Sequence, residues 1–227
     1  MQSGVAFTQT SHEYLSRGLS KHSSGDYDAA IANFNQAISI NQESSVAYFC
    51  RGRSYAHLEK HQEAITDYTK ALEINPQNIN ALFLRGISKH AVGNFKEAIN
   101  DFNEVSTIEP SIKDLYLNRG LSKYEMNDYR GAIMDFNREL GKRDEPNIEI
   151  YFHRAMAQYA QLNFGGAIQD FDKVIENKPY HREAIYYRGI SYIRKGHLTE
   201  GCEDLERAEE LGDERASIHI RNRCNLP

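Results

Sequence analysis

Residues 83–90 read FLRGISKH, and residues 15–22 and 117–124 repeat this motif as LSRGLSKH and LNRGLSKY. The Arg-Gly pair within it, written Arg-Ala in one copy, begins at Arg17, Arg51, Arg85, Arg119, Arg154 and Arg188. Successive arginines lie 34 residues apart, except for one step of 35 residues. Self-similarity at a fixed period of this length indicates an array of repeated supersecondary units.

A second marker keeps the same period. In every copy a small residue precedes a bulky one by four positions: Ala30 and Phe34, Ala64 and Tyr68, Ala98 and Phe102, Ala132 and Phe136, Ala167 and Phe171, Gly201 and Leu205. Apolar residues within a copy recur at three, four and seven positions, which predicts α-helices. Each copy is therefore predicted to contain two helices that cross where small residues let their backbones approach.

Breaks in the pattern predict where the helices end. The turn inside the hairpin is predicted near Glu59 in the second copy. The matching residues in four other copies are Gly25, Gly93, Asn127 and Gly196. Glycine and asparagine tolerate the left-handed conformation that closes a helix. The dipeptides Asn75-Pro76, Glu109-Pro110 and Lys178-Pro179 are predicted to stop the second helix, because a residue before proline resists helical geometry.

These features resemble the tetratricopeptide repeat. The residues that carry the resemblance in the second copy are Tyr48, Gly52, Tyr55, Ala64, Tyr68 and Pro76. An arginine replaces the family's leucine before the glycine in all six copies, so the chain looks like six repeats of an Arg-Gly subtype. The resemblance covers residues 11 to about 215 and implies an all-α, right-handed superhelical solenoid.

The period divides the chain into an N-terminal extension, six repeats and a C-terminal end. The predicted segments are 1–10 for the extension, then the repeats 11–44, 45–78, 79–112, 113–147, 148–181 and 182–215, and finally 216–227 for a capping helix and tail. In the last segment Ala216, Ile220 and Cys224 fall on one helical face, as expected for a helix that covers the final repeat.

An acidic or amide residue follows each arginine after sixteen positions, at Asn33, Asp67, Asp101, Asp135, Asp170 and Asp204. We expect each arginine to meet such a residue, either in its own hairpin or in the next one. The predicted structural ladder is Arg51, Asp67, Arg85, Asp101, Arg119, Asp135, Arg154, Asp170, Arg188 and Asp204. Recurrence in every copy favours this structural role over a row of arginines that binds phosphates or acidic peptides.

Composition limits the possible partners. The net charge is −5 without a basic stripe, which argues against nucleic acid as a partner. No stretch approaches 18 apolar residues and the N-terminus does not resemble a signal peptide, so neither a membrane partner nor export is expected. The three cysteines are an odd number without CxxC spacing, which argues against a disulfide scaffold and predicts a reducing, cytoplasmic location.

The resemblance implies that the first helix of each repeat lines a concave groove. Carried onto this sequence, the predicted groove residues are Leu15, Phe49, Arg53, Phe83, Ile87, Leu117, Asn118, Leu121, Phe152, His153, Met156 and Tyr186. This lining is apolar and aromatic, which predicts a protein-interaction scaffold that binds a peptide or amphipathic helix. Two alternatives stay open: packing between neighbouring first helices, and self-assembly into homo-oligomers through the groove or the end faces.

Other functions are not supported by motifs. Co-chaperone members of the family hold a chaperone's C-terminal tail with lysine and asparagine, but the matching first positions here are Leu15, Phe49, Phe83 and Leu117. His57 and His61 do not form the HExxH zinc motif, and Cys50 has no evident catalytic partner. We therefore expect neither an enzyme nor a cofactor or metal.

One copy departs from the pattern. The fourth repeat is one residue longer, with the extra residue within 141–145. Glu139 stands where the other copies have small apolar residues: Ala37, Ala71, Val105, Val174 and Ala208. A tolerated loop insertion is favoured over a change of superhelix pitch.

Overall fold

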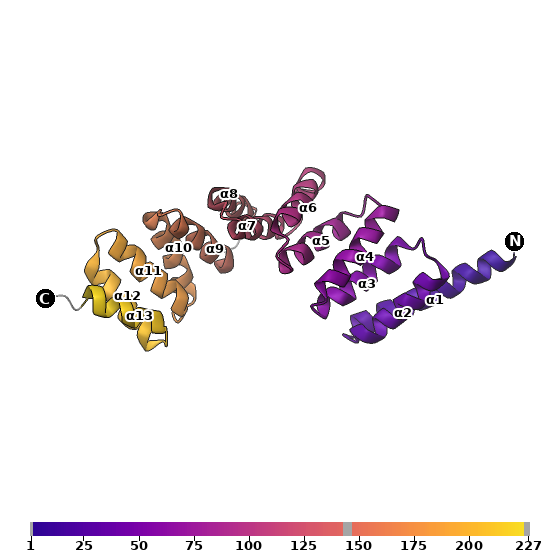
Figure 1. Cartoon of the computed structure of the whole chain (residues 1–227), viewed down its shortest axis with the longest axis horizontal. Coiled ribbons are helices and arrows are strands. Elements are labelled where there is room, and N and C mark those ends of the chain that lie inside the picture. The colour runs from indigo at the N-terminus through magenta and orange to yellow at the C-terminus, as the bar shows by residue number, and fades with distance from the viewer. Residues whose placement is uncertain (1, 143–146, 225–227) are drawn as a thin grey trace. The chain divides into compact units, whose positions relative to one another are not determined.

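The predicted helix pairs are present along the chain, and the all-α class is confirmed (Figure 1). The computed structural model describes residues 2–142 and 147–224, and within these ranges every regular element is a helix. Residues 143–146, where part of the predicted insertion falls, and residues 225–227 of the predicted tail lie outside the described residues. The chain divides into two units, Met1–Leu115 and Tyr116–Pro227.

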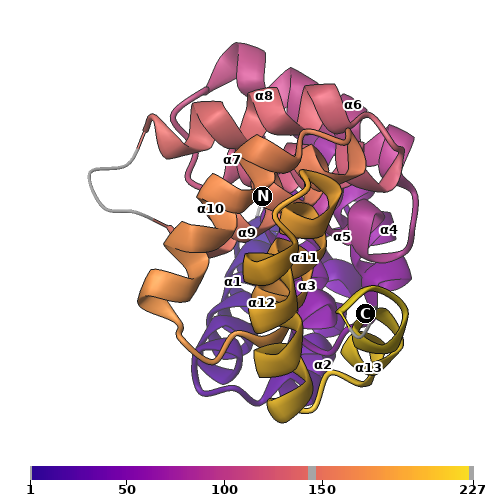
Figure 2. The same ribbon diagram turned by 90° about the vertical axis from the view of Figure 1, so that its left-hand side faces the viewer.

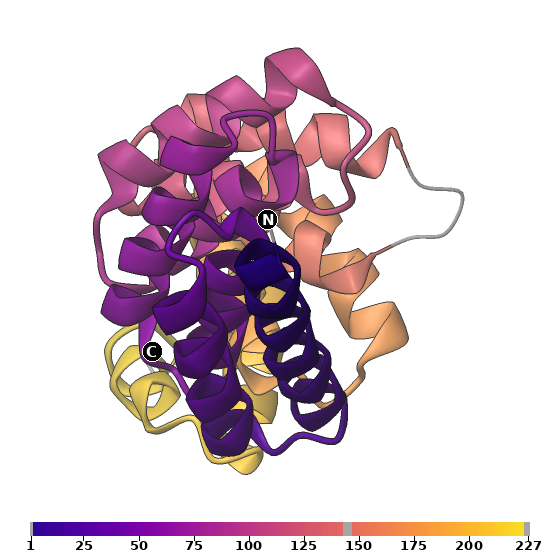
Figure 3. The same cartoon turned by 90° about the vertical axis from the view of Figure 1, so that its right-hand side faces the viewer.

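The first unit contains three helix pairs. Its helices are α1 (Gln2–Ser23), α2 (Tyr27–Ile40), α3 (Ser45–His57), α4 (His61–Ile74), α5 (Ile79–Ala91) and α6 (Phe95–Ile108). The N-terminal helix, indigo in Figure 3, packs beside α2, and each later helix contacts the one before it. Helix α1 begins at Gln2, so residues assigned to the N-terminal extension continue the first helix of the first hairpin.

The second unit contains three further pairs and the C-terminal segment. Its helices are α7 (Leu115–Glu125), α8 (Tyr129–Leu140), α9 (Ile148–Ala160), α10 (Phe164–Asn177), α11 (Arg182–Arg194), α12 (Leu198–Glu210) and α13 (Glu214–His219), followed by the π-helical turn η1 (Ile220–Cys224). Helix α13 and η1 pack against α12 (Figure 2), and Ala216 and Ile220 are buried there.

Local chemistry sets the helix ends. The side chains of Ser44 and Asn78 accept hydrogen bonds from backbone N–H groups in the first turns of α3 and α5. Helices α4 and α6 end at Ile74 and Ile108, two residues before a proline. The turns within the hairpins use the left-handed conformation, with φ of 81° at Gly93.

A tight crossing joins the two helices of each hairpin. A Cβ atom added to Gly86 would lie 2.7 Å from Cε1 of Phe102, whose side chain is fully buried. The equivalent glycines at positions 18, 52 and 120 face Phe34, Tyr68 and Phe136 in the same way. The ring therefore fills the space that a side chain at the glycine would need, and this contact fixes the distance between the helices.

Beside this crossing, arginine and aspartate form bidentate ion pairs. Arg51 donates from Nε to Oδ2 of Asp67 at 2.8 Å and from Nη2 to Oδ1 at 2.6 Å. The same two-point contact joins Arg85 to Asp101, Arg119 to Asp135, Arg154 to Asp170 and Arg188 to Asp204. All five aspartates are buried, so each carboxylate depends on nearby cations for neutralisation: its arginine in every pair, and a lysine as well at Asp101 and Asp135.

The remaining guanidinium nitrogen reaches the preceding hairpin. Nη1 of Arg51 donates to Oδ1 of Asn35 at 2.6 Å, and Nη1 of Arg154 donates to Oδ1 of Asn137 at 2.6 Å. Nη1 of Arg188 contacts Asp172 at 2.7 Å. One side chain thus hydrogen-bonds two consecutive hairpins. In the first hairpin, Arg17 instead lies exposed over the ring of Tyr14.

Glu139 has a structural partner. Its side chain is 1% exposed, and Oε2 accepts a hydrogen bond from the backbone N–H of Tyr116 at 3.1 Å. This N–H lies in the first turn of α7, where no intrahelical acceptor is available. Nζ of Lys142 lies 3.7 Å from the same carboxylate oxygen. The departure at Glu139 therefore supplies a cap for the neighbouring helix.

The cysteine pairing corrects one expectation. Cys202 in α12 and Cys224 in η1 form a disulfide across 22 residues, with Cα atoms 5.7 Å apart. The odd cysteine count suggested free thiols, but the C-terminal segment folds back onto α12 and brings these two together. Cys50 is the free cysteine; it is buried, and burial raises the pKa of its thiol. The cysteines therefore no longer support a reducing compartment.

The tight crossing predicts a large effect from a single methyl group. Replacing Gly86 by alanine is expected to lower the free energy of unfolding by about 1–3 kcal/mol, because the new Cβ would force the buried Phe102 ring to shift. Gly165→Ala is the control, since its new Cβ would lie 3.6 Å from the flexible Lys195 Nζ, and it should stabilise by about 0.5–1 kcal/mol. Urea denaturation of both variants measures this, and equal stabilities would refute the crossing constraint.

The ion pairs predict a second contrast. Asp101 accepts hydrogen bonds from Arg85 and lies 2.8 Å from Nζ of Lys89, so Asp101→Ala leaves two cations without their carboxylate. We expect a loss of roughly 3–5 kcal/mol in unfolding free energy. Glu73→Ala, which removes an exposed pair with Lys70, should cost less than about 1 kcal/mol. An unchanged melting temperature for Asp101→Ala would contradict the stabilising role of the pair.

Candidate functional site

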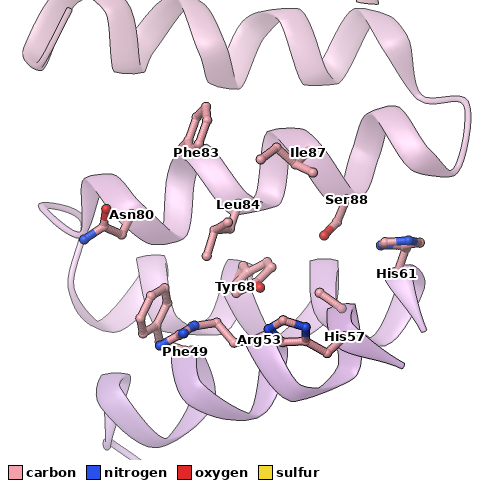
Figure 4. Close-up of a pocket in the computed structure, with 11 residues that line it drawn as sticks. Phe49, Arg53, His57, His61, Tyr68, Asn80, Phe83, Leu84, Ile87 and Ser88 are labelled. Carbon is pink, nitrogen blue, oxygen red and sulfur yellow. The ribbon is translucent and has the colours of Figure 1, made fainter. Parts of the chain in front are cut away.

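Four of the predicted groove residues meet at one pocket in the first unit. Phe49 and Arg53 come from α3, and Phe83 and Ile87 come from α5 (Figure 4). They line a pocket of about 570 Å³. Leu15, the other predicted groove residue of this unit, packs instead against the cluster around Phe34 and Cys50.

The predicted groove residues of the second unit are more deeply packed. Leu117 and Tyr186 are 8% and 7% exposed and belong to the hydrophobic core. Leu121, Phe152 and Met156 are partly buried against that core. Asn118 and His153 are also half-buried. The His153 ring stacks on the Phe136 ring, with centroids 6.2 Å apart. These side chains contribute mainly to packing between helices.

The pocket combines apolar walls with a polar edge. Its apolar part is formed by Phe49, Ala56, Tyr68, Phe83, Leu84 and Ile87. Its polar part is formed by Arg53, His57, His61, Asn80 and Ser88. In Figure 4, Tyr68 of α4 lies between Leu84 of α5 and Arg53 of α3. Aspartate and glutamate do not occur among these lining residues.

The second hairpin lacks a ring pair that other hairpins contain. In four of the other five hairpins an aromatic or histidine ring at the end of the first helix contacts a ring five residues later, whereas the sixth has Ile193 and Leu198 there. These pairs are His22 with Tyr27, His90 with Phe95, Tyr124 with Tyr129, and Tyr159 with Phe164, with centroids 5.2–5.7 Å apart. The second hairpin has Ala56 and His61 at these positions, and both line the pocket.

His61 is left with an unsatisfied nitrogen. Its Nδ1 is buried and has no hydrogen-bond partner among the described residues. Buried polar groups normally find such a partner, and an unpaired one is costly. The missing ring at position 56 and the unpaired nitrogen at position 61 therefore occur in the same hairpin, on the wall of the same pocket.

Arg53 also differs from its counterparts. The equivalent residues in the other copies are all apolar: Leu19, Ile87, Leu121, Met156 and Ile190. Its guanidinium lies 5.9 Å from the centroid of the Phe49 ring, and no carboxylate within the described ranges pairs with it. The fold does not require a cation at this position, in contrast to Arg51 two residues earlier.

Further histidines lie beside Arg53. Nδ1 of His22 is 2.9 Å from Oγ of Ser54, and His57 stacks on Tyr27 with centroids 4.6 Å apart. Burial, together with the positive charges of Arg53 and His57, lowers the pKa of His22. Arg53 therefore acts electrostatically on the His22 ring at this end of the pocket.

Sequence reasoning considered His57 and His61 only as metal ligands and did not include them in the groove. The structure places both on the pocket wall. Within residues 2–142 and 147–224, no group of three or more metal-ligating side chains comes together. No helix in the same ranges has the length and apolar character needed to span a membrane.

The consecutive hairpins with glycine–aromatic crossings define a helical repeat protein. Family profiles described as "Tetratricopeptide repeat" match residues 45–78 and 117–182, and one described as "TPR repeat" matches residues 18–58. The chain belongs to the tetratricopeptide repeat family. The search of curated proteins gave no match.

Solved structures share this fold. A tetratricopeptide repeat protein from Parabacteroides merdae is 20% identical, with a TM-score of 0.75 over 94% of this chain and 87% of that one. YrrB, described as a TPR protein with an unusual peptide-binding site, is 23% identical, with a TM-score of 0.73 over 83% and 97%. Pseudomonas aeruginosa pilF is 16% identical, with a TM-score of 0.72 over 96% and 99%. These similarities establish the fold alone.

The influence of Arg53 on its surroundings can be measured through the pKa of His22. Side-chain NMR titration should give its imidazole a pKa below the usual value of about 6.5. Replacing Arg53 by leucine should raise this pKa, because a nearby positive charge disfavours the protonated ring. An unchanged pKa in the Arg53→Leu variant would show that Arg53 does not influence this end of the pocket.

Proposed function

We propose that this chain is a non-catalytic scaffold that binds a peptide or amphipathic helix against the first helices of its repeats. The observation that carries the proposal is the pocket of about 570 Å³ between α3 and α5. This volume lies within the range of about 300–1,000 Å³ that is typical of ligand sites. Apolar walls with a few polar groups are the usual lining of such sites.

Two further observations support a binding role at this place. Phe49 and Phe83 are only partly buried, although large aromatic side chains gain most from complete burial. YrrB, which shares the fold, is described as having a peptide-binding site. A peptide laid along α3 and α5 would cover both rings and contribute apolar area to the complex.

The test uses 12-residue random peptides displayed on phage and selected on the immobilised full chain. Selected peptides are then measured by fluorescence anisotropy against three proteins: the wild type, Phe83→Asp and Val46→Asp. We expect Phe83→Asp to weaken binding at least about tenfold, because it places a charge on an apolar wall. Val46 is 53% exposed on α3 and does not line the pocket, so Val46→Asp should bind like the wild type.

Failure to select any peptide, or equal binding by all three proteins, would contradict the proposal. Sedimentation velocity over a concentration series tests the alternative of self-assembly. A concentration-dependent oligomer that Phe83→Asp dissolves would assign the pocket to contacts between copies of the chain, whereas a persistent monomer supports binding of another molecule.

A further inference from the structure

We propose that the pocket between α3 and α5 selects a peptide in which an aromatic side chain lies next to an aspartate or glutamate. This inference rests on the proposed peptide-binding function and specifies its ligand. Two departures of the second hairpin from the other copies carry it. One is the missing ring at Ala56, and the other is the cation at Arg53.

The missing ring determines the apolar part of the ligand. Four other hairpins close this region with a ring pair at 5.2–5.7 Å, whereas Ala56 contributes only a methyl group. The remaining surroundings are apolar or aromatic and include Phe49, Tyr68 and Leu84. A ring supplied by the ligand would take the place of the absent one, with the edge-to-face or offset contacts that aromatic rings favour.

The cation determines the charged part. Arg53 has no carboxylate partner within the described ranges, although all five ladder arginines, including Arg51 and Arg85, are each paired with an aspartate there. Its planar guanidinium can donate two parallel hydrogen bonds to one carboxylate. Because aspartate and glutamate are absent from the pocket lining, an acidic ligand meets no like charge there.

Two histidines add hydrogen-bond donors to the pocket wall. His57 and His61 line the pocket, with His61 near Ser88 in Figure 4, and both can donate a hydrogen bond from the ring. Nδ1 of His61 has no partner among the described residues, so no hydrogen bond through that nitrogen fixes its ring. The pocket wall away from the Arg53 guanidinium therefore offers further donors to polar groups of a bound peptide.

The binding geometry requires a short separation between the two ligand groups. Arg53 lies against the Phe49 ring, with 5.9 Å from the guanidinium carbon to the ring centroid. The charged and aromatic subsites are thus neighbours on α3. Adjacent residues of an extended segment, with Cα atoms about 3.8 Å apart, can reach both.

The experiment uses the phage-selected 12-residue peptides, resynthesised with acetylated N-termini and amidated C-termini so that only side chains carry a carboxylate. Each peptide is paired with a version in which Glu or Asp becomes Gln or Asn, and with a version in which the aromatic residue becomes alanine. Affinities are measured by fluorescence anisotropy on the full chain.

Three protein variants are compared with the wild type. Arg53→Leu and Ala56→Tyr give the second hairpin residue types that other copies carry at these positions, so both are expected to fold, which thermal melting checks. Arg17→Leu is the matched charge control, because Arg17 is an exposed arginine in the same unit that does not line the pocket.

We expect the selected peptides to be enriched in aromatic–acidic pairs. Arg53→Leu should weaken the acidic peptides at least tenfold and leave their amide versions within about twofold, whereas Arg17→Leu should change neither. Ala56→Tyr should weaken both versions, because its ring occupies the space for the ligand's ring. Alanine in place of the aromatic residue should weaken binding to the wild type by a similar factor.

Results of three kinds would overturn the inference. The first is a set of peptides that bind Phe83→Asp more weakly than the wild type but bind equally well in their acidic and amide versions. The second is a loss of peptide affinity in Arg53→Leu that is no larger than the loss in Arg17→Leu. The third is a clear preference for peptides with a free C-terminal carboxylate over the amidated peptides. In each case the peptide still binds at the pocket and the proposed function stands. Absence of any peptide sensitive to Phe83→Asp would instead remove the proposed function itself.

Discussion

The rest of the structure depends on the close crossing of two helices at each Arg-Gly glycine. A Cβ at Gly86 would approach Phe102 to 2.7 Å, so glycine and ring together define one interhelical distance. With that distance fixed, Arg85 and Asp101 lie opposite each other and form two hydrogen bonds. The crossing therefore determines where the ion pair can form, and the ion pair in turn holds the two helices in register.

Hairpins of this size cannot bury their apolar faces alone, so the contacts between consecutive hairpins are as important as those within them. The arginine serves both purposes. Arg154 uses Nε and Nη2 for Asp170 in its own hairpin and Nη1 for Asn137 in the preceding one. Hydrogen bonds to Asp170 raise the pKa of Arg154, which keeps it charged. The planar fork of arginine makes this possible, and lysine could not reproduce it.

The helices, their turns and the residues at their crossings follow from spacing and residue type, because these depend on interactions between near neighbours in the sequence. Sequence reasoning left open whether each arginine pairs within its own hairpin, and it missed the contact to Asn137, although polar residues recur at that register. It also missed the turn residue Leu162, whose φ of 62° is set by the hairpin geometry against the preference of leucine.

Contacts between distant parts of the chain were not predicted. The disulfide between Cys202 and Cys224 requires the C-terminal segment to fold back onto α12, which no local pattern specifies. The pocket was not predicted, because its lining combines side chains of three helices, α3, α4 and α5, that lie up to 39 residues apart in the sequence.

In a repeat array, the positions that agree between copies report the requirements of stacking, so a departure requires its own explanation. Glu139 departs from a small apolar position, and the N–H of Tyr116 accounts for it within the fold. Three departures in the second hairpin are of a different kind. Ala56 removes a ring contact, His61 has a buried nitrogen without a hydrogen-bond partner, and Arg53 is a cation without a carboxylate. Each of these changes forgoes an interaction that the other copies make or that a folded chain normally provides. All three line one pocket, and a single ligand with a ring and a carboxylate would compensate for the ring and the charge together.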